Sequence, residues 1–405
     1  MTIAGCTSTP GQPIAASAPA QLIQPMTKVT EQPKQGYFSD PYPIHLAASD
    51  ANAIPESLSG TTKQVLSCSG QPTADCFHPS QSQVTATIGP ALAQQAAADG
   101  ATLQDAFNYN IFQDDSGAWQ MAVTYRVSNR QHPKATNWTA ILHAHPTSTT
   151  PDAVPTSWAA DSLLVGSFTD PSKADYDGKY FEDAGKLYLV YSDRLSDTPA
   201  RDGIVAQLMM SPETPTATEP TVLLAPGDYS SELFFGLHQS DTFKLIETGN
   251  ITEVDGKFVM AYSTGAYYEP DYKIGLAWSD TFLPAAGQPY RKITMTDSGG
   301  VWGKAGRSEV RYLMQSQEPG WPNYVGKTVL APGVPAVIQD GQSWYLTFAG
   351  YLPSDAPTDP KTGHYVPSSR RPFFAPLSVR IPAGASVAGT SEADLANWIT
   401  VGSNS

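Results

Sequence analysis

The sequence predicts an all-β protein, and within that class a five-bladed β-propeller. Three observations lead to this prediction. Pro (35) and Gly (32) are frequent among the 405 residues, a turn with Asp and Gly recurs ahead of aromatic strands, and the copies of this turn are almost evenly spaced. Frequent Pro and Gly suit many short strands joined by turns better than long helices. Hydrophobic residues make up 40% of the chain, which is enough for a large core.

The recurring turn is clearest at Gly117, Gly185, Gly256 and Gly341. Each glycine precedes a strand-like run with at least two aromatic residues, as in Asp255-Gly-Lys-Phe-Val-Met-Ala-Tyr262. We interpret each turn as the hairpin between two strands, because glycine readily takes the positive φ that tight hairpins need. The glycines are separated by 68, 71 and 85 residues. Such a repeat, with several strands in each copy, is typical of propeller blades.

A further blade is expected from Tyr37 to about Ile88, with a less clear hairpin near Gly60. The Ala-rich stretch from Gly89 to Ala101 is the one expected helix, a surface connector between blades. An ordinary β-sandwich with scattered hairpins, or two sandwiches in tandem, is the alternative. The near-even spacing of the turns favours the propeller.

Residues 1–33 are expected to be a lipoprotein-type N-terminus and flexible linker, ahead of a propeller domain over residues 34–405. Ile3-Ala-Gly-Cys6 is similar to a bacterial lipobox, in which the cysteine becomes the lipidated first residue. The charged and apolar parts of a signal peptide do not precede it, which indicates a trimmed sequence. A chance cysteine is the alternative. Residues 7–33 are rich in Pro, Ala, Thr, Ser and Gln and are expected to bury no core.

Cys68 and Cys76 remain as an even pair once Cys6 is set aside. In an exported protein such a pair is expected to form a disulfide, with two free thiols as the alternative. No apolar run approaches the ~18 residues of a membrane span. We therefore expect a bacterial cell-envelope lipoprotein or secreted protein that contacts the membrane only through a lipid anchor on Cys6.

The formal net charge of −14 makes nucleic acid an unexpected partner, because an acidic surface repels phosphates. It suits a neutral ligand such as a sugar, or a cationic one. The chain contains no Gly-x-Ser-x-Gly elbow, His-Glu-x-x-His, Gly-rich phosphate loop or Cys-x-x-Cys. We expect a monomer with no cofactor and no metal. His143 and His145 alternate on one predicted strand face, but no acid cluster accompanies them in the sequence.

A propeller brings equivalent positions of its innermost strands to one mouth of the central channel. Four acids precede the predicted hairpins at such positions: Asp40, Asp105, Asp177 and Glu247. Their numbers are separated by 65, 72 and 70 residues. A buried acid costs several kcal/mol unless it is paired or used, so one acid per blade is hard to explain by folding alone. We expect these acids to converge at the mouth.

Three of the acids lie in motifs that resemble those of the family 43 glycoside hydrolases. Asp40-Pro-Tyr-Pro-Ile44 resembles the first-blade motif, which carries the general base. The run from Asp177 to Leu189 resembles the third-blade motif, whose Asp orients the acid and tunes its pKa, and Glu247-Thr-Gly-Asn-Ile251 is similar to the motif of the general acid. Residues 272–280 and 332–346 resemble the end of the fourth blade and the fifth blade. The likeness covers residues 37 to 385 as scattered motifs.

The sequence departs from this family at three places. Val334 takes the place of a His that lies near a channel ion or water in the family, so a central metal is not expected. Gly249 replaces the Pro of the Glu-x-Pro motif, and Gln104-Asp105-Ala106 replaces a Trp-Ala-Pro-Asp motif. The chain is therefore expected to be a distant member or a separate, related family.

The resemblance implies an inverting hydrolase of arabinofuranosyl or xylosyl linkages in plant-type polysaccharide or oligosaccharide. Glu247 would protonate the leaving oxygen, Asp177 would raise the pKa of Glu247 by repulsion, and Asp40 would activate a water. Inversion needs the acid and base carboxyls to be about 6.5–9.5 Å apart. Predicted substrate contacts are Asp105, which would bind hydroxyls, Tyr267 and Trp302, which would stack on sugars, and Arg371 beside Arg370.

Each residue also has a structural alternative, because Asp40 before Pro can initiate a turn and Asp177 or Glu247 can end a strand. A fructan- or sucrose-active retaining enzyme on the same fold is the nearest functional alternative. Its third-blade motif is Arg-Asp-Pro, whereas this chain has Tyr176-Asp177-Gly178. A non-catalytic propeller that binds glycans at the cell surface is the other.

Overall fold

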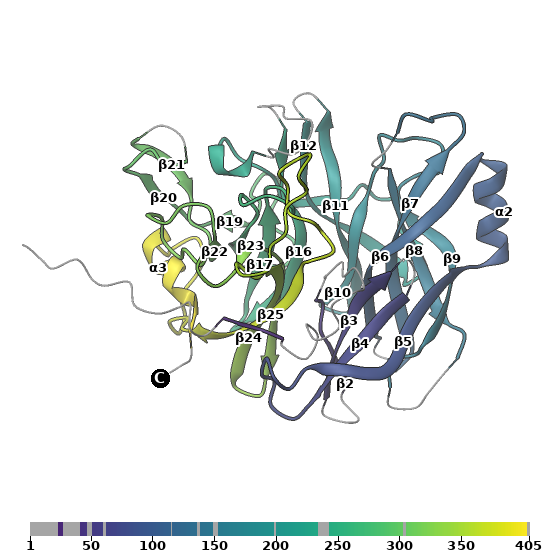
Figure 1. The fold of residues 1–405 in the computed structure, drawn as a ribbon, viewed down its shortest axis with the longest axis horizontal. Helices are drawn as coiled ribbons and strands as arrows, with labels where there is room; N and C mark the ends of the chain where they lie inside the picture. Colours follow the sequence, from purple (N-terminus) through teal and green to yellow (C-terminus); the bar gives the residue numbers. More distant parts are fainter. Residues whose placement is uncertain are drawn as a thin grey trace, which may run out of the picture.

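The computed structural model describes residues 23–26, 41–46, 51–59, 62–114, 116–135, 138–148, 153–197, 200–233, 243–302 and 305–402. Within them the chain is built almost entirely of antiparallel strands in consecutive order (Figure 1). Five groups of strands form the blades. Blade 1 consists of β2 (Ile44–Leu46), β3 (Ala51–Ser59), β4 (Thr62–Ser69) and β5 (His78–Ile88), and blade 2 of β6 (Ala101–Gln113), β7 (Trp119–Asn129), β8 (Thr139–Pro146) and β9 (Ser157–Val165). Blade 3 consists of β10 (Tyr176–Asp183), β11 (Lys186–Asp197), β12 (Ala200–Ser211) and β14 (Thr221–Leu224), blade 4 of β16 (Glu247–Val254), β17 (Lys257–Thr264), β18 (Lys273–Ser279) and β19 (Arg291–Lys292), and blade 5 of β23 (Leu330–Asp340), β24 (Ser343–Tyr351) and β25 (Arg371–Val379).

Short elements complete the blades. Some extend a blade, some form a separate ribbon, and some are helical: β13 (Thr214–Pro215) and β15 (Lys244–Leu245) on blade 3, β22 (Met314–Gln315) on blade 4, β1 (Gln24–Pro25) and β26 (Ile399–Val401) on blade 5, the ribbon of β20 (Thr294–Asp297) and β21 (Arg307–Val310), the 3₁₀ turn η1 (Ser230–Glu232), and the helices α2 (Pro90–Ala98) and α3 (Glu392–Trp398).

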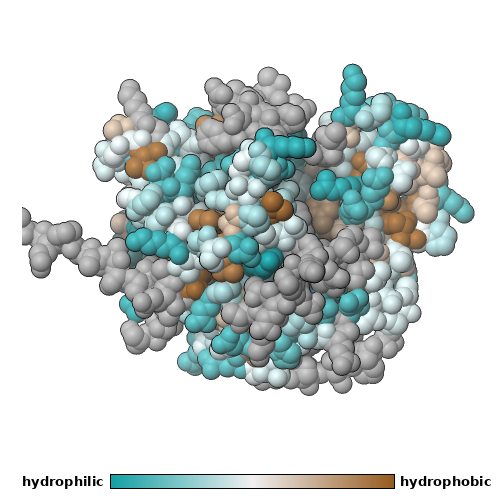
Figure 2. All heavy atoms as spheres, in the orientation of Figure 1, coloured by the Kyte–Doolittle hydropathy of each residue, from teal (hydrophilic) through white to brown (hydrophobic). Residues whose placement is uncertain are grey.

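The hydrophobic core shows that the blades close into a ring. Five of the clusters of buried side chains each lie between two consecutive blades of the described chain. The cluster that closes the ring packs Ile54 and Leu66 of blade 1 against Tyr345 and Phe374 of blade 5. The predicted five-bladed propeller is therefore confirmed. Figure 2 shows mostly hydrophilic residues with small hydrophobic patches over the described part of one face, because the apolar side chains lie between blades.

The four predicted hairpins are confirmed. Gly117, Gly185, Gly256 and Gly341 join the first and second strands of blades 2 to 5, with φ of 81°, 72°, 70° and 56°. Gly60 lies outside the described residues. The strands beside it, β3 and β4, pair from Ser59–Thr62 outward, but they are the second and third strands of blade 1. That predicted turn is therefore not equivalent to the other four.

Blades 1 and 2 are joined into one eight-stranded sheet, which the sequence did not predict. β5 pairs with β9 in parallel, from Thr85–Ser157 to Ile88–Ala160. The predicted helix is confirmed as α2, which follows β5 and buries Leu92 and Ala96. Gly89 permits the close approach to β9, because a Cβ there would lie 2.9 Å from the Ala160 carbonyl oxygen.

Part of the predicted linker belongs to the fold, which corrects the boundary at residue 33. β1 pairs with β25 through Gln24–Phe374 and Pro25–Phe373. Ile23 and Met26 flank it and are 3% and 0% exposed. Two apolar side chains and an open strand edge are enough to dock this short segment, although its composition is that of a linker. Residues 1–22, which include Cys6, and 27–33 lie outside the described residues.

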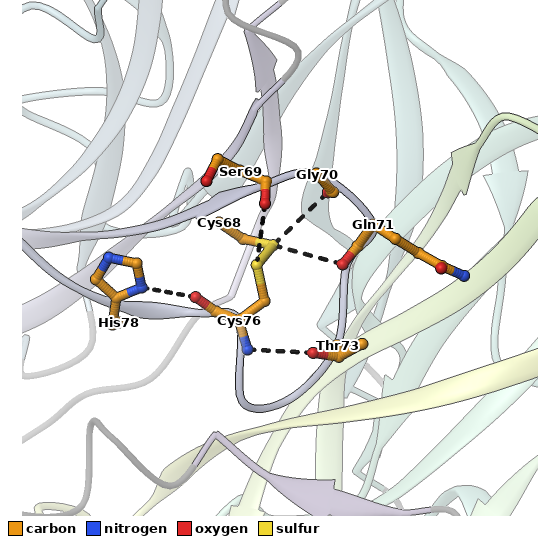
Figure 3. Close-up of a disulfide and its surroundings, with 7 residues drawn as sticks. All are labelled: Cys68, Ser69, Gly70, Gln71, Thr73, Cys76 and His78. Carbon is orange, nitrogen blue, oxygen red and sulfur yellow. Dashed lines mark hydrogen bonds between the residues drawn. A yellow bond between two sulfur atoms is a disulfide. The ribbon is translucent and has the colours of Figure 1, made fainter.

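The predicted disulfide between Cys68 and Cys76 is confirmed. It closes the turn between β4 and β5 (Figure 3), with the Cys68 side chain fully buried. The Thr73 hydroxyl accepts a bond from the Cys76 amide at 3.2 Å, so the turn is also held by hydrogen bonds. In the part of the chain that the structure describes, no helix has the length and apolar character needed to cross a membrane.

Candidate active site

In blades 2 to 5, a β-bulge near the start of the innermost strand decides which side chains lie at the channel mouth. In blade 4, Glu247 pairs with Ser263 before the register shifts, and in blade 3 Tyr176 holds the equivalent position opposite Ser192. Asp177 therefore lies one residue further along than Glu247. In blade 2 the same positions are Phe107 and Asn108, and in blade 5 they are Gly333 and Val334.

This register corrects the prediction of one equivalent acid per blade. Asp105 lies three residues before the position of Asp177, in a separate bulge between Gln104 and Ala106, and its side chain is exposed. The buried Asn108, with φ of 49°, is the blade 2 residue in the position of Asp177. The spacing of acids in the sequence did not reveal that Asn108 is the equivalent residue. Each bulge adds one residue to its strand, and no fixed sequence motif marks where it occurs.

Two tyrosine hydroxyls hold the Glu247 carboxyl. Tyr176 donates to Oε2 at 2.9 Å, and Tyr272 donates to Oε1 at 2.6 Å. Tyr176 comes from the neighbouring blade, and Tyr272 immediately precedes β18 of the same blade as Glu247. Glu247 itself is partly exposed. The carboxyl is therefore oriented by neutral donors while part of the residue stays open to solvent.

The surroundings raise the pKa of Glu247 to about 7, mainly because the carboxyl lies deep among protein atoms that replace water. The hydroxyls of Tyr272 and Tyr176 oppose this rise, because they donate to the ionised form. The charge of Asp177 adds to the rise, and that of Arg370 opposes it. Repulsion by Asp177, the cause expected from the sequence, therefore contributes less than burial.

Asp177 has charged as well as neutral partners. Its side chain is 1% exposed, accepts a hydrogen bond from Tyr42 at 2.9 Å, and forms an ion pair with Lys179 at 2.9 Å. The Lys179 ammonium also lies 4.3 Å from the centre of the Tyr42 ring. Burial is the largest influence and raises the pKa of Asp177 above its ordinary value, although Lys179 and Tyr42 oppose the rise.

Asp40, the predicted general base, lies outside the described residues. The two residues that follow it belong to the site. Tyr42 bonds to Asp177 in blade 3, and the Pro41 carbonyl accepts a hydrogen bond at 2.8 Å from Thr347 in blade 5. The chain next to Asp40 is thus anchored to two blades, and the role of Asp40 stays a prediction.

Arg370 is a site residue that the predicted set named only as the neighbour of Arg371. Its guanidinium lies 5.5 Å from the centre of the Tyr272 ring and 5.7 Å from that of Tyr267. It is 1% exposed, and its Nε and Nη2 have no hydrogen-bond partner among the residues that the structure describes. Arg371 instead donates to the Arg370 carbonyl at 3.1 Å and lies 3.9 Å from Asp355. Arg370 therefore lies beside the Glu247 partner Tyr272, whereas the contacts of Arg371 are with Asp355 and the backbone at the start of β25.

Comparisons with known proteins bear on the fold. No family model and no curated protein sequence matches the chain. The α-L-arabinofuranosidase from Lactobacillus brevis does match in structure, with a TM-score of 0.60 and 15% identity over 84% of this chain and 91% of that one. A thermostable family-43 glycoside hydrolase matches with a TM-score of 0.54 and 15% identity over 90% and 93%. This is the fold of the family 43 glycoside hydrolases.

A third family 43-like match is the exo-1,5-α-L-arabinanase from a bovine ruminal metagenomic library. It has a TM-score of 0.53 and 16% identity over 92% of this chain and 99% of that one. The whole propeller therefore corresponds, and no large part of these neighbours lacks a counterpart. At such low identities the likeness concerns the fold, so the chemistry must be argued from the residues of this chain.

The two residues predicted to stack on sugars, Tyr267 and Trp302, differ in their burial and in the side chains that pack against them. Tyr267 is half-buried beside Arg370, and its carbonyl accepts a hydrogen bond from Tyr351 at 3.1 Å. Trp302 is 9% exposed and packs edge-on against Tyr312 and Trp321. This packing leaves little of the Trp302 ring for a sugar, whereas Tyr267 adjoins the candidate site.

The mouth positions of blades 2 to 5 include no His. The Val334 side chain has no ligand atom where the family has a His. Among the described residues, no three His, Cys, Asp or Glu side chains are grouped as around a metal ion. His143 and His145 do share one acid, Asp161, which binds Nδ1 of both rings and which the sequence pattern did not reveal.

Proposed function

We propose that this chain is a glycoside hydrolase that cleaves arabinofuranosyl or xylosyl linkages with inversion at the anomeric carbon. The observation that carries the proposal is Glu247. A carboxyl with a pKa of about 7, partly exposed and oriented by two neutral donors, can hold a proton near neutral pH and transfer it. On the family 43 fold, this carboxyl lies in the motif that resembles that of the general acid.

The proposed reaction uses the carboxyls in different states of ionisation. Glu247 protonates the glycosidic oxygen as the bond to the anomeric carbon breaks, and Asp40 takes a proton from the water that attacks the opposite face. Asp177, paired with Lys179, stays a fixed acceptor that adds negative potential near Glu247. Arg370 lies against the rings of Tyr272 and Tyr267 and adds positive charge near Glu247.

The names of the structural neighbours support this choice of sugar. One is an α-L-arabinofuranosidase and another an exo-1,5-α-L-arabinanase. Pentose-based oligosaccharides are neutral, which is compatible with the acidic chain, net charge −14. We therefore propose arabino- and xylo-oligosaccharides as the first substrates to test.

The test compares Glu247→Gln with wild type on arabino-oligosaccharides and xylo-oligosaccharides. Their leaving oxygen is an alcohol that needs protonation, so turnover should fall by at least ~100-fold, the lower end of what general acid catalysis contributes. A nitrophenyl arabinofuranoside or xyloside should lose less, because its leaving group departs without a proton. Glu253→Gln is the matched control, since Glu253 is an exposed acid on the same strand, β16.

Other outcomes would point to the alternatives. Unchanged turnover in Glu247→Gln would remove Glu247 from the mechanism. Cleavage of sucrose or levan with retained configuration would indicate the fructan-active enzyme, and binding of the same glycans without turnover would indicate a non-catalytic surface propeller. The stereochemical course follows from the anomer that NMR detects first.

We also propose that the protein is exported as a monomer and lipidated on Cys6. The Cys68–Cys76 disulfide supports export, because such bonds persist in oxidising compartments. Expressed behind a lipoprotein signal peptide, the chain should incorporate labelled palmitate and the Cys6→Ser variant should not. Equal labelling of the two would contradict the anchor.

A further inference from the structure

In each of blades 3, 4 and 5, as at Asn108 in blade 2, a residue other than glycine at the channel mouth has a positive φ. Asp177, Thr248 and Val334 have φ of 65°, 58° and 54° and occupy the same bulge position in blades 3, 4 and 5. Positive φ is uncommon for residues other than glycine, and especially for β-branched ones, so the surrounding structure must hold it in place. Thr248 directly follows Glu247, so the backbone conformation of Thr248 affects the direction in which the Glu247 side chain projects from the strand.

Each of these residues donates its backbone N–H to a hydroxyl of the preceding blade. The Asp177 amide bonds to Thr124 Oγ1 at 3.0 Å, that of Thr248 to Ser192 Oγ at 3.4 Å, and that of Val334 to Ser263 Oγ at 2.8 Å. The three hydroxyl residues lie on the second strands β7, β11 and β17 and are fully buried. One arrangement thus recurs at three consecutive blade junctions.

The hydroxyl residues also occupy equivalent register positions. Thr124, Ser192 and Ser263 pair with Phe107, Tyr176 and Glu247, which are the mouth residues of their own blades. Each hydroxyl residue thus pairs with the mouth residue of its own blade and accepts a hydrogen bond from the next blade. At the ring closure, the buried Thr347 of β24 donates to the carbonyl of Pro41, next to Asp40.

We infer that Thr124 and Ser192 are positioning residues of the active site: they hold the bulges that place Asp177 and Glu247 side by side at the mouth. Among the described residues, Thr124 Oγ1 and Ser192 Oγ accept the hydrogen bonds of these two amides. A buried N–H that loses its partner is costly, so the bulge without its hydroxyl would relax to another conformation. The carboxyls would then move relative to each other. The activity part of this inference rests on the proposed function.

The experiment replaces the hydroxyls without changing the size of the side chains much. Ser192→Ala and Thr124→Val remove the acceptor, and Thr124→Ser keeps it. Thr252→Val is the matched control, because the Thr252 hydroxyl also bridges blades, to the Val337 carbonyl at 3.0 Å, but lies further along β16 from the mouth. All four are compared with wild type by thermal unfolding, to confirm that each variant folds.

Amide hydrogen exchange tests the inference without any substrate. In Ser192→Ala, the peptide around residues 245–251 should exchange faster than in wild type, because the Thr248 amide has lost its acceptor. Thr252→Val should leave the Glu247–Thr248 segment unchanged. In Thr124→Val the faster exchange should appear around Asp177, and Thr124→Ser should restore protection. Unchanged exchange at these amides would overturn the inference.

Kinetics give the second readout. Ser192→Ala and Thr124→Val should lower kcat on the order of 10-fold or more, with a smaller change in KM, because misplaced groups lose transition-state contacts. Thr252→Val should keep kcat, and Thr124→Ser should recover most of it. A loss of kcat in Thr252→Val equal to that in Ser192→Ala would also overturn the inference. Altered exchange in a protein that hydrolyses none of the glycans would instead remove only the proposed function.

Discussion

Blades 3 and 4 each bring one carboxyl to the channel mouth, but they surround it with different donors. Asp177 in blade 3 is paired with the Lys179 ammonium, while Glu247 in blade 4 accepts hydrogen bonds from the neutral hydroxyls of Tyr176 and Tyr272. A neighbouring ammonium favours the ionised carboxyl strongly, whereas neutral hydroxyls compete weakly with burial. The two carboxyls in adjacent blades thus differ in their partners, which supports the proposed roles of Asp177 as a fixed acceptor and of Glu247 as the titrating acid.

The largest expected effect comes from removing the ammonium. Lys179→Met would leave Asp177 buried without its cation, and we expect a loss of about 3–5 kcal/mol in the free energy of unfolding. Urea denaturation measures it. Lys257→Met is the control, because the Lys257–Asp280 pair is closer to the surface, with side chains 19% and 35% exposed, and its removal should cost no more than about 1 kcal/mol.

The double variant Lys179→Met with Asp177→Asn sharpens this test. It removes the uncompensated carboxyl, so it should recover part of the lost stability. Equal stability losses in the single variants at Lys179 and Lys257 would show that Asp177 does not depend on its ammonium, and the difference between the two blades would disappear.

A smaller effect is expected when one hydroxyl is removed from Glu247. The Tyr272 hydroxyl favours ionised Glu247, so Tyr272→Phe should raise the pKa of Glu247 further above 7. Since the acid must be protonated to act, activity should persist to higher pH, and the alkaline limb of kcat/KM should move up by about one unit. Tyr180→Phe is the control, because the Tyr180 hydroxyl donates to the Pro212 carbonyl instead. A limb that stays in place would contradict the role of the hydroxyl.

The smallest expected effect has the opposite sign. Asp177 raises the pKa of Glu247 through its charge, and this cause ranks below the hydrogen bonds. Asp177→Asn should therefore lower that pKa and move the alkaline limb to lower pH, by less than Tyr272→Phe moves it up. The position of the limb is the readout, since kcat falls as well if Asp177 orients the acid. A shift toward higher pH would show that Asp177 acts on Glu247 in another way.

Local signals in the sequence were enough to predict the hairpins of blades 2 to 5 and two acids that the structure places at the channel mouth. Glycines such as Gly185 and Gly256 mark hairpins because positive φ is a property of the residue itself. Asp177 and Glu247 were found because each stands a short, similar distance ahead of such a hairpin. The pairing of Cys68 with Cys76 follows from there being only one other cysteine, which the lipobox-like motif set aside.

Only the tertiary structure decided which neighbouring residue faces the mouth. Asn108 rather than Asp105, and Arg370 rather than Arg371, accompany the acids, because a bulge or a shift of one residue along the chain changes what a side chain contacts. The partners of Glu247 and the docking of residues 23–26 on β25 also depend on segments far apart in the chain. The sequence by itself determined the turns and the acids. The closed ring decided their partners, because the pKa of Glu247 depends mainly on burial, which exists only after the blades pack.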